Sequence, residues 1–348
     1  MKILIVGGGP AGSATAISLL EHNPSAEVYI VERKWGPQSI CAGGLGIEAY
    51  RKVNEHVGVP KEHVEHVIRS FEICVKNTCL TVSAEDLGTD MLGVVIDRKS
   101  FDRHLLRKAE KMGATVVHSI PLNKRFNYVV DARGAESAIK HVPKHEVDIT
   151  VQYYVKHRID RLKIVFDGSK TKYGYLWFFP SRNTVKAGFG RSLTEERKDP
   201  IRSYAEKHGY TRVEGKPLPL YKPLPLISGR TLKVGTAAGL VCAVTGAGIV
   251  YAVESGWKAG EALAKNKPEK YPRSMWKTLA ELKLRYAIKK TITPINPPTE
   301  NTLSKLLKHY FPKTPNVRKE IMRLLLQLVK TDPKAALKLL YHTVNSLT

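Results

Sequence analysis

The first twenty residues, MKILIVGGGPAGSATAISLL (residues 1–20), decide the fold. An apolar run at 2–6 leads directly into glycines and then into a helical pattern at 10–22, and residues 27–31 (EVYIV) have the pattern of a second strand. Gly7, Gly9 and Gly12 form a GxGxxG turn, and Glu32 ends the second strand. In such a βαβ unit the glycines let the backbone approach a pyrophosphate at the helix N-terminus, and the carboxylate accepts hydrogen bonds from a ribose. The sequence therefore predicts a dinucleotide site, although this motif alone does not identify the dinucleotide.

Length and composition bound the class of protein. A chain of 348 residues is enough for about two to three domains, and 43% hydrophobic with 25% charged residues excludes a disordered or collagen-like chain. Four cysteines exclude a disulfide scaffold. The net charge is +24, and 13 of these charges fall in residues 257–348, where 19 Lys+Arg face 6 Asp+Glu. Such a basic surface attracts phosphate groups. It is equally typical of the solvated surface of a thermophilic protein, and the low count of three glutamines also favours a thermophilic origin.

Two apolar segments imitate export or membrane signals. Residues 1–20 have the order of a signal peptide, but the glycine cluster favours a strand that enters a turn. Residues 234–253 carry no charge over twenty positions, yet four glycines and two threonines interrupt them, which favours a loop and a helix inside a soluble domain. We therefore expect a cytoplasmic protein.

The rest of the chain alternates between two kinds of pattern. Residues 101–112 have helical spacing, and 116–117 and 128–131 have the composition of further strands. Residues 71–82 predict a hairpin that turns near Asn77, and residues 147–190 predict an antiparallel sheet. From residue 271 onward the chain is basic and helical, with several prolines.

Three later segments identify the dinucleotide by resemblance. Residues 97–102 (DRKSFD), 130–137 (VDARGAES) and 235–249 (GTAAG…TGAGI) resemble, in this order, the DRxxFD, DAxGxxS and GDAAG…TGxGI segments of flavin monooxygenase-like proteins. The resemblance implies the p-hydroxybenzoate-hydroxylase-like fold with FAD as cofactor. Thr236 stands where that family usually has an aspartate that binds the ribityl chain. Threonine keeps a hydrogen bond but loses its charge assistance, so weaker FAD binding is expected here, with lost binding as the alternative.

A fourth segment points to the substrate. Residues 175–190 read YxWxFP, seven residues, and then GxG, which resembles the signature of the geranylgeranyl reductase family of flavoproteins. On a strand, alternate residues share a face, so Tyr173, Tyr175, Trp177 and Phe179 would line one wall of an apolar cavity. The alternative is an aromatic core face covered by a helix. The resemblance implies a substrate site at five residues: Tyr175, Trp177, Phe179, Pro180 and Gly188.

The four cysteines have different expected roles. Residues 39–46 (SICAGGLG) resemble that family's cysteine–glycine loop, which lies between flavin and substrate. Cys41 is thus a candidate redox or proton-donating thiol, or else a small residue that packs against the flavin ring. Cys74 and Cys79 flank the predicted hairpin turn, and we expect two reduced thiols there, with a cross-strand disulfide as the alternative. No spacing of the twelve histidines suits a metal, so no metal site is expected.

These motifs together predict an α/β protein with a Rossmann-like FAD-binding domain, an antiparallel-sheet substrate domain and a C-terminal helical region. The expected FAD-binding domain combines 1–70, 95–140 and 225–270, the substrate domain combines 71–94 and 141–224, and 271–348 form the basic helical region. The residues expected at the cofactor are Gly7, Gly9, Ala11, Gly12, Glu32, Arg33, Cys41, Ala42, Gly44, Arg98, Thr236, Gly248 and Ile249.

The resemblance implies an FAD-dependent reductase of isoprenoid double bonds, acting on a lipid or a diphosphate. An aromatic monooxygenase or halogenase of the same fold, and an idle isoprenoid-binding protein, are the alternatives; nucleic-acid binding is not expected. The electron donor is left open among ferredoxin, NADPH and a quinol. Amphipathic stretches at 321–329 and 335–340 are expected to pack onto the FAD domain, with peripheral contact to a membrane surface as the alternative.

Overall fold

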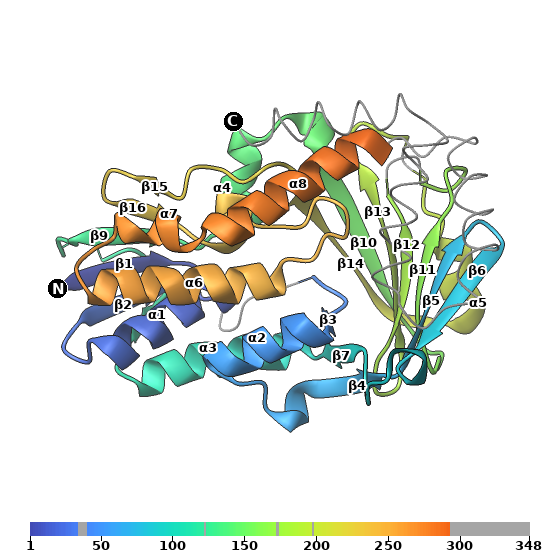
Figure 1. The fold of residues 1–348 in the computed structure, drawn as a ribbon, viewed down its shortest axis with the longest axis horizontal. Helices are drawn as coiled ribbons and strands as arrows, with labels where there is room; N and C mark the ends of the chain where they lie inside the picture. Colours follow the sequence, from blue (N-terminus) through green and yellow to red (C-terminus); the bar gives the residue numbers. More distant parts are fainter. Residues whose placement is uncertain (34–39, 122, 172–173, 197, 293–348) are drawn as a thin grey trace.

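Two sheets occupy opposite ends of the molecule. The computed structural model describes residues 1–292, apart from 34–39, 122, 172–173 and 197. Figure 1 shows a parallel sheet with its helices at one end and a strongly twisted sheet at the other. The class predicted from the sequence, a mixed α/β fold, is therefore confirmed.

The first sheet has six strands in the order β15-β16-β9-β1-β2-β8. Parallel pairing joins β1 (Lys2–Val6) to β2 (Glu27–Val31) and to β9 (Tyr128–Asp131). Further out, β8 (Thr115–Val117) pairs in parallel with β2, and β16 (Thr231–Lys233) pairs in parallel with β9. The edge strand β15 (Ile227–Ser228) is antiparallel to β16. Helix α1 (Pro10–His22) packs against α3 (Arg98–Lys111) and α6 (Ile249–Ala264). Ile3, Ile5, Ile17 and Ile30 are fully buried, so the βαβ unit forms the centre of the larger core.

The second sheet has seven strands in the order β14-β10-β13-β12-β11-β5-β6. These are β14 (Tyr210–Pro219), β10 (Val147–Val155), β13 (Val185–Ser192), β12 (Leu176–Pro180), β11 (Leu162–Phe166), β5 (Ser70–Val75) and β6 (Thr78–Ser83). All neighbours pair antiparallel except β11 with β5. One face packs under α5 (Arg202–His208), where Val155, Ala187 and Phe189 meet Ile201 and Ala205.

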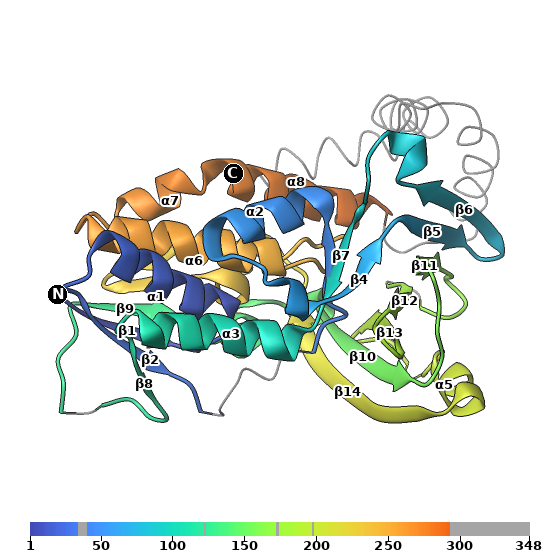
Figure 2. The same ribbon diagram turned by 90° about the horizontal axis from the view of Figure 1, so that it is seen from below.

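Short elements join the two halves. A three-stranded sheet in the order β3-β7-β4 contains β3 (Gly44–Gly46), β7 (Gly93–Ile96) and β4 (Val64–Ile68), and α2 (Ile47–Val57) follows β3. Figure 2 shows β4 and β7 running from the helical half toward the seven-stranded sheet. The remaining helices are α4 (Ala135–Ala138), α7 (Lys270–Ser274) and α8 (Trp276–Ile292). Single 3-10 turns lie at η1 (Lys61–His63), η2 (Glu85–Leu87), η3 (Ile139–His141), η4 (Lys144–Glu146) and η5 (Gly235–Ala238).

Helix α8 ties the two halves together at Glu146. This carboxylate is almost fully buried and accepts hydrogen bonds from Tyr286, Lys289 and Lys290, each at 2.9 Å. Burial alone would raise the pKa of Glu146, but the two ammonium groups lower it overall. Glu146 therefore stays ionised as the anchor of α8.

Most expected elements are present, with two differences. The hairpin is confirmed, and the uncharged segment 234–253 is a 3-10 turn, a loop and the start of α6, as predicted. Helix α3 begins at Arg98 rather than at residue 101, because the Asp97 side chain accepts hydrogen bonds from the backbone N–H groups of Lys99 and Ser100. Among the described residues, no helix combines the length and apolarity needed to cross a bilayer.

The expectation of two reduced thiols in the hairpin is wrong. Cys74 and Cys79 form a disulfide, since they lie directly opposite each other in the β5–β6 ladder with their Cα atoms 4.0 Å apart. The proposed division into domains stays a prediction, and the stretches at 321–329 and 335–340 lie outside the described residues.

Candidate functional site

The glycine turn brings the first strand close to the N-terminus of α1. Gly7 has φ of 112°, and a Cβ atom at Gly12 would lie 1.9 Å from the Gly7 carbonyl oxygen, so the first and third glycines have no room for a side chain. A Cβ atom at Gly9 would meet no atom of the described residues within 4 Å, and no side chain caps the helix that starts there, at Pro10 and Ala11. The free N–H groups of α1 are therefore presented to an open space, where an anion would be stabilised.

Glu32 and Arg33 follow the second strand at the edge of this space. The Glu32 carboxylate accepts a hydrogen bond of 2.9 Å from the Gly8 N–H, so it lies directly at the glycine turn. Arg33 is exposed and makes an ion pair of 2.5 Å with Glu136 of α4. The structure brings Glu32 to the dinucleotide turn, while the Arg33 guanidinium is turned toward α4.

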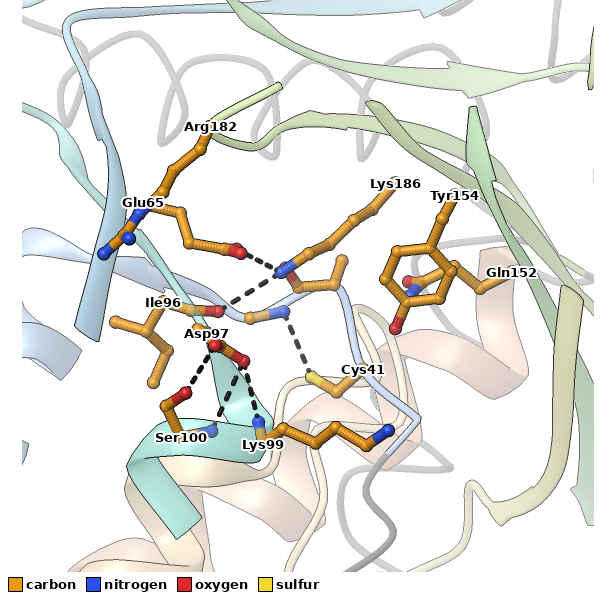
Figure 3. Close-up of polar contacts among 12 residues, drawn as sticks. Cys41, Glu65, Ile96, Asp97, Lys99, Ser100, Gln152, Tyr154, Arg182 and Lys186 are labelled. Carbon is orange, nitrogen blue, oxygen red and sulfur yellow. Dashed lines mark hydrogen bonds and ion pairs between the residues drawn. The ribbon is translucent and has the colours of Figure 1, made fainter. Parts of the chain in front are cut away.

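The cysteine–glycine loop is held by a buried lysine from the opposite sheet. Lys186 of β13 is 4% exposed and donates hydrogen bonds to the carbonyl oxygens of Ala42 (3.2 Å) and Ile96 (3.3 Å). Its ammonium also makes an ion pair with Glu65 of β4. Cys41 is half-buried, and its Sγ accepts a hydrogen bond of 3.4 Å from the Gly43 N–H. Figure 3 shows Lys186, Tyr154 and Gln152 pointing from the sheet toward this loop.

Arg98 supplies a buried positive charge beside Cys41. It makes two parallel hydrogen bonds to Asp102 one turn further along α3, at 3.0 and 2.9 Å. Burial alone would lower the pKa of Arg98, but the charges of Asp102 and Cys41 outweigh it and raise the pKa. Lys216 of β14 faces the same group, and burial followed by the Arg98 charge lowers the pKa of its ammonium. A fixed cation thus lies next to the expected flavin-facing thiol.

Thr236, Gly248 and Ile249 belong to a segment that packs beside the N-terminus of α1, since a Cβ atom at Gly235 would lie 2.9 Å from the Ala11 Cβ. Thr236 is half-buried in η5, and Gly248 precedes α6 without any side-chain cap, so that Ile249 opens the helix with free backbone N–H groups. The loop between them is anchored by Tyr175, whose hydroxyl donates a 2.5 Å hydrogen bond to the Thr245 carbonyl. This bond joins the aromatic strand to the loop that precedes α6.

The aromatic residues of the YxWxFP segment face the parallel-sheet half. Phe179 packs on the glycine loop, because a Cβ atom at Gly44 would lie 2.4 Å from the Phe179 ring. Trp177 covers Gly188 in the same way, and its Nε1 donates a long hydrogen bond of 3.4 Å to Gln152. Tyr175 and Trp177 lie 6.0 Å apart between ring centroids. Pro180 is buried at the end of β12, and Tyr173 lies outside the described residues.

A cleft of about 320 Å³ opens beside the cysteine–glycine loop. Its walls come from both halves of the molecule and include Cys41, Arg98, Lys99, Tyr154, Lys186 and Arg212. Arg212 stacks over the Tyr154 ring at 3.7 Å, and the Tyr154 hydroxyl donates to Glu214 at 3.0 Å. The cleft is therefore polar, and its basic side chains outnumber the acidic ones of Glu65, Asp97 and Glu214.

The residues present fit FAD. Two helix N-termini without side-chain caps, at Gly9 and at Gly248, offer backbone donors at the two places where the sequence predicts cofactor contacts. Gly9 leaves open space where a pyrophosphate must approach the backbone, and Glu32 lies at the glycine turn. The assignment of individual contact residues stays a prediction.

Sequence reasoning missed four polar residues of the seven-stranded sheet: Asp148, Gln152, Lys186 and Lys216. The alternation of polar and apolar residues along 147–155 was a signal for Asp148 and Gln152, whereas no local pattern pointed to Lys186 or Lys216. The alternation is equally typical of a strand with one solvent-exposed face, and nothing in it says that the polar side is buried.

Comparison with known proteins places this fold in a class. The chain has the fold of FAD-dependent oxidoreductases. A geranylgeranyl bacteriochlorophyll reductase-like protein from Thermoplasma acidophilum superposes with a TM-score of 0.79 at 20% identity, over 98% of both chains. A flavin-dependent brominase superposes with a TM-score of 0.70 at 15% identity, over 93% of both chains. No model of a known protein family matches the chain.

Sequence similarity narrows the class to one family. The chain is 28% identical over 313 residues to digeranylgeranylglycerophospholipid reductase 3 of Methanosphaera stadtmanae, covering 76% of this chain and 77% of the relative. It is 26% identical over 316 residues to the chloroplastic geranylgeranyl diphosphate reductase of Oryza sativa subsp. japonica, covering 76% of this chain and 66% of the relative. The resemblance to the geranylgeranyl reductase family is thereby confirmed, and the chain is a relative of these enzymes.

Proposed function

We propose that the protein is an FAD-dependent reductase that saturates carbon–carbon double bonds of an isoprenoid chain carried by a lipid or a diphosphate. The observation that carries the proposal is the aromatic strand β12, whose Phe179 ring packs directly on Gly44 of the cysteine–glycine loop. Apolar rings are thereby set against the loop on which the flavin is expected. The two relatives named above, one acting on a phospholipid and one on a diphosphate, support the same reaction class.

The chain's own residues bind, orient and exclude water. When bound, FAD supplies the hydride through its N5 atom, and the flavin carries the redox chemistry. The N-terminus of α1 would hold the pyrophosphate, and the N-terminus of α6 would offer backbone donors to a second part of the cofactor. Trp177 and Tyr175 would fix the isoprenoid chain, since a reacting carbon must be held at a near-attack distance for efficient transfer. Lys186 holds the Ala42 carbonyl, and so the position of the loop between cofactor and substrate.

The basic rim of the cleft supports a phosphorylated substrate. Lys99, Arg103 and Arg212 are exposed side chains that line the cleft, where a phosphate or diphosphate head group would meet positive charge. The electron donor is left open among ferredoxin, NADPH and a quinol. Contact with a membrane surface stays a prediction.

A stopped-flow experiment tests the proposal. Protein loaded with FAD and reduced by dithionite, freed of excess reductant, is mixed anaerobically with geranylgeranyl diphosphate. The expected result is return of the oxidised flavin absorbance at a rate that rises with substrate concentration, whereas the saturated diphosphate gives no return. Reduced flavin that stays unchanged with every geranylgeranyl substrate, while the protein hydroxylates a phenol with NADPH and oxygen, would favour the monooxygenase alternative.

A further inference from the structure

Strand β10 carries a row of polar side chains on its buried face. Asp148, Thr150, Gln152 and Tyr154 form this row, and on the other face Val151, Tyr153 and Val155 belong to the core under α5. The polar row shares its face with Lys186, which lies opposite Tyr154 and reaches the Ala42 carbonyl. The row therefore looks toward the parallel-sheet half, where FAD is expected. Asp148 is 4% exposed and Gln152 is fully buried.

Asp148 is a buried carboxyl group that no neighbour neutralises. Within the part of the chain that the structure describes, no hydrogen bond reaches its side chain. Lys289 of α8, the cation that interacts with Asp148, is engaged by Glu146 and by the Leu220 carbonyl, each at 2.9 Å. Glu146 and Glu195 add negative charge from the flanking turns. Burial is the main cause that raises the pKa of Asp148 to about 7, and Lys289 opposes it only in part. The group thus keeps most of its proton at pH 6 and loses it around neutral pH.

The position of Asp148 connects it to the expected site of reaction. Its Oδ2 atom lies 3.6 Å from the place that a Cβ atom would take at Gly190, the second glycine of the GxG segment. The Gly190 N–H donates to the Tyr175 carbonyl at 3.2 Å, and the Tyr175 hydroxyl reaches Thr245 in the loop before α6. Burial raises the pKa of Tyr175, so its hydroxyl keeps its proton as the donor to Thr245. Asp148 therefore lies beside Gly190, which in turn contacts the segment of Tyr175.

We propose that the carboxyl group of Asp148 donates the proton that completes saturation of the isoprenoid double bond. The inference rests on the proposed function. Saturation adds a hydride and a proton across the double bond, and the hydride carries both reducing electrons. The O–H bond of Asp148 breaks with its electron pair left on the carboxylate, and the π electrons of the alkene form the new C–H bond to the proton. The carboxylate then takes up a proton from water before the next turnover.

The burial of this group is otherwise unexplained. A carboxyl group without partners destabilises a folded protein, and a leucine on this strand would avoid the cost. A general acid must lie near the substrate, keep its proton at the working pH and be shielded from water. Asp148 keeps its proton and is shielded from bulk water. Because Gly190 beside it has no side chain, there is space next to Asp148 for the substrate. Cys41 is the competing donor from the opposite wall.

The test compares Asp148→Asn, Asp148→Ser and Cys41→Ala with the wild type. Each FAD-loaded protein is reduced and mixed with geranylgeranyl diphosphate, and the saturated product is measured by mass spectrometry between pH 5 and 9. The wild-type rate is expected to fall about tenfold per pH unit above pH 7, as the acid loses its proton. Both Asp148 variants should be slower at pH 6 by about 10²- to 10⁴-fold, the contribution of a positioned acid, and should lack this decline. Cys41→Ala should keep the wild-type pH profile.

A second readout needs neither FAD nor substrate. A raised carboxyl pKa means that the folded protein keeps a proton which the unfolded chain releases above pH 4, so wild-type stability should fall between pH 4 and 7. The melting temperature of the cofactor-free wild type should therefore fall more steeply over this range than that of Asp148→Asn. Asp199→Asn is the matched control, since Asp199 accepts a hydrogen bond from Tyr153 on the opposite face of β10 and should leave both pH profiles unchanged.

The outcomes separate the two proposals. If the wild type reduces geranylgeranyl diphosphate and both Asp148 variants do so within threefold at pH 6, Asp148 is not the donor and the proposed function stands. A Cys41→Ala variant that alone loses the pH profile would assign the proton to the thiol instead. If the wild type reduces no geranylgeranyl substrate, the proposed function and this inference both fail. If the melting temperatures of wild type and Asp148→Asn change with pH in parallel between pH 4 and 7, Asp148 is ionised at neutral pH, and this result also overturns the inference.

Discussion

Replacing Lys186 by methionine removes the charge that holds the cysteine–glycine loop against the second sheet. The side chain keeps nearly its length but loses its ion pair with Glu65 and its bonds to the Ala42 and Ile96 carbonyls. Removing one partner of a buried ion pair costs about 3–5 kcal/mol of folding free energy, because the remaining charge stays buried alone. The Lys186 and Glu65 side chains are 5% and 13% exposed, so solvent screening reduces this cost little. At about 2 °C per kcal/mol, the melting temperature should fall by about 6–10 °C.

Differential scanning fluorimetry of the FAD-free protein measures this shift. Lys163→Met is the matched control, because Lys163 forms a 2.9 Å ion pair with Glu72 on the same sheet but is 37% exposed, and a pair of this kind contributes about 0–1 kcal/mol. Combining Lys186→Met with Glu65→Leu should recover much of the loss, since no buried charge is then left alone. A single Lys186→Met variant that melts no lower than Lys163→Met would refute the idea that this pair fixes the loop.

Three further substitutions probe the expected cofactor and substrate contacts. Glu32→Ala should weaken FAD binding by about 1–3 kcal/mol, the cost of losing a charged acceptor, and a fluorescence titration with FAD measures it. Thr236→Asp should tighten FAD by restoring a charge-assisted bond to the ribityl chain; the same titration would show weaker binding if the site has been rebuilt around threonine. Trp177→Ala should lower turnover of geranylgeranyl diphosphate on the order of 10²-fold while FAD stays bound, since the chain would no longer be positioned. Full activity of that variant would make the indole a core residue only.

The parts of the fold with strong local signals were predictable from the sequence. The strand, glycine turn and helix of residues 2–22 appear with the expected bounds, because an apolar run, a GxGxxG turn and a helical stretch each act locally. Helix α3 was predicted to begin three residues too late because the capping role of Asp97 was not used. An aspartate directly before a helical pattern is a known helix start signal.

The buried polar face of β10 could not be predicted in this way. Alternation at Asp148, Thr150 and Gln152 normally indicates a strand with one wet side. Here the parallel-sheet half of the molecule covers the polar side of β10, so that Asp148 and Gln152 are buried. Only the tertiary structure shows this burial. The Cys74–Cys79 bond likewise depends on the register of the hairpin, which brings the two residues into one cross-strand pair. Lys186 and its three partners are separated by at least 90 residues in the sequence, so no local pattern could have predicted these contacts.

The central claim is that this flavoprotein-type fold saturates an isoprenoid chain, and the mass of the lipid tests it most directly. FAD-loaded protein, reduced by dithionite, is incubated without oxygen with geranylgeranyl diphosphate and, separately, with a digeranylgeranylglycerophospholipid. We predict that at least one of the two gains the mass of two hydrogens, or a multiple of it, only when protein and FAD are both present. Unchanged masses for both lipids with fully reduced, FAD-loaded protein would contradict the claim.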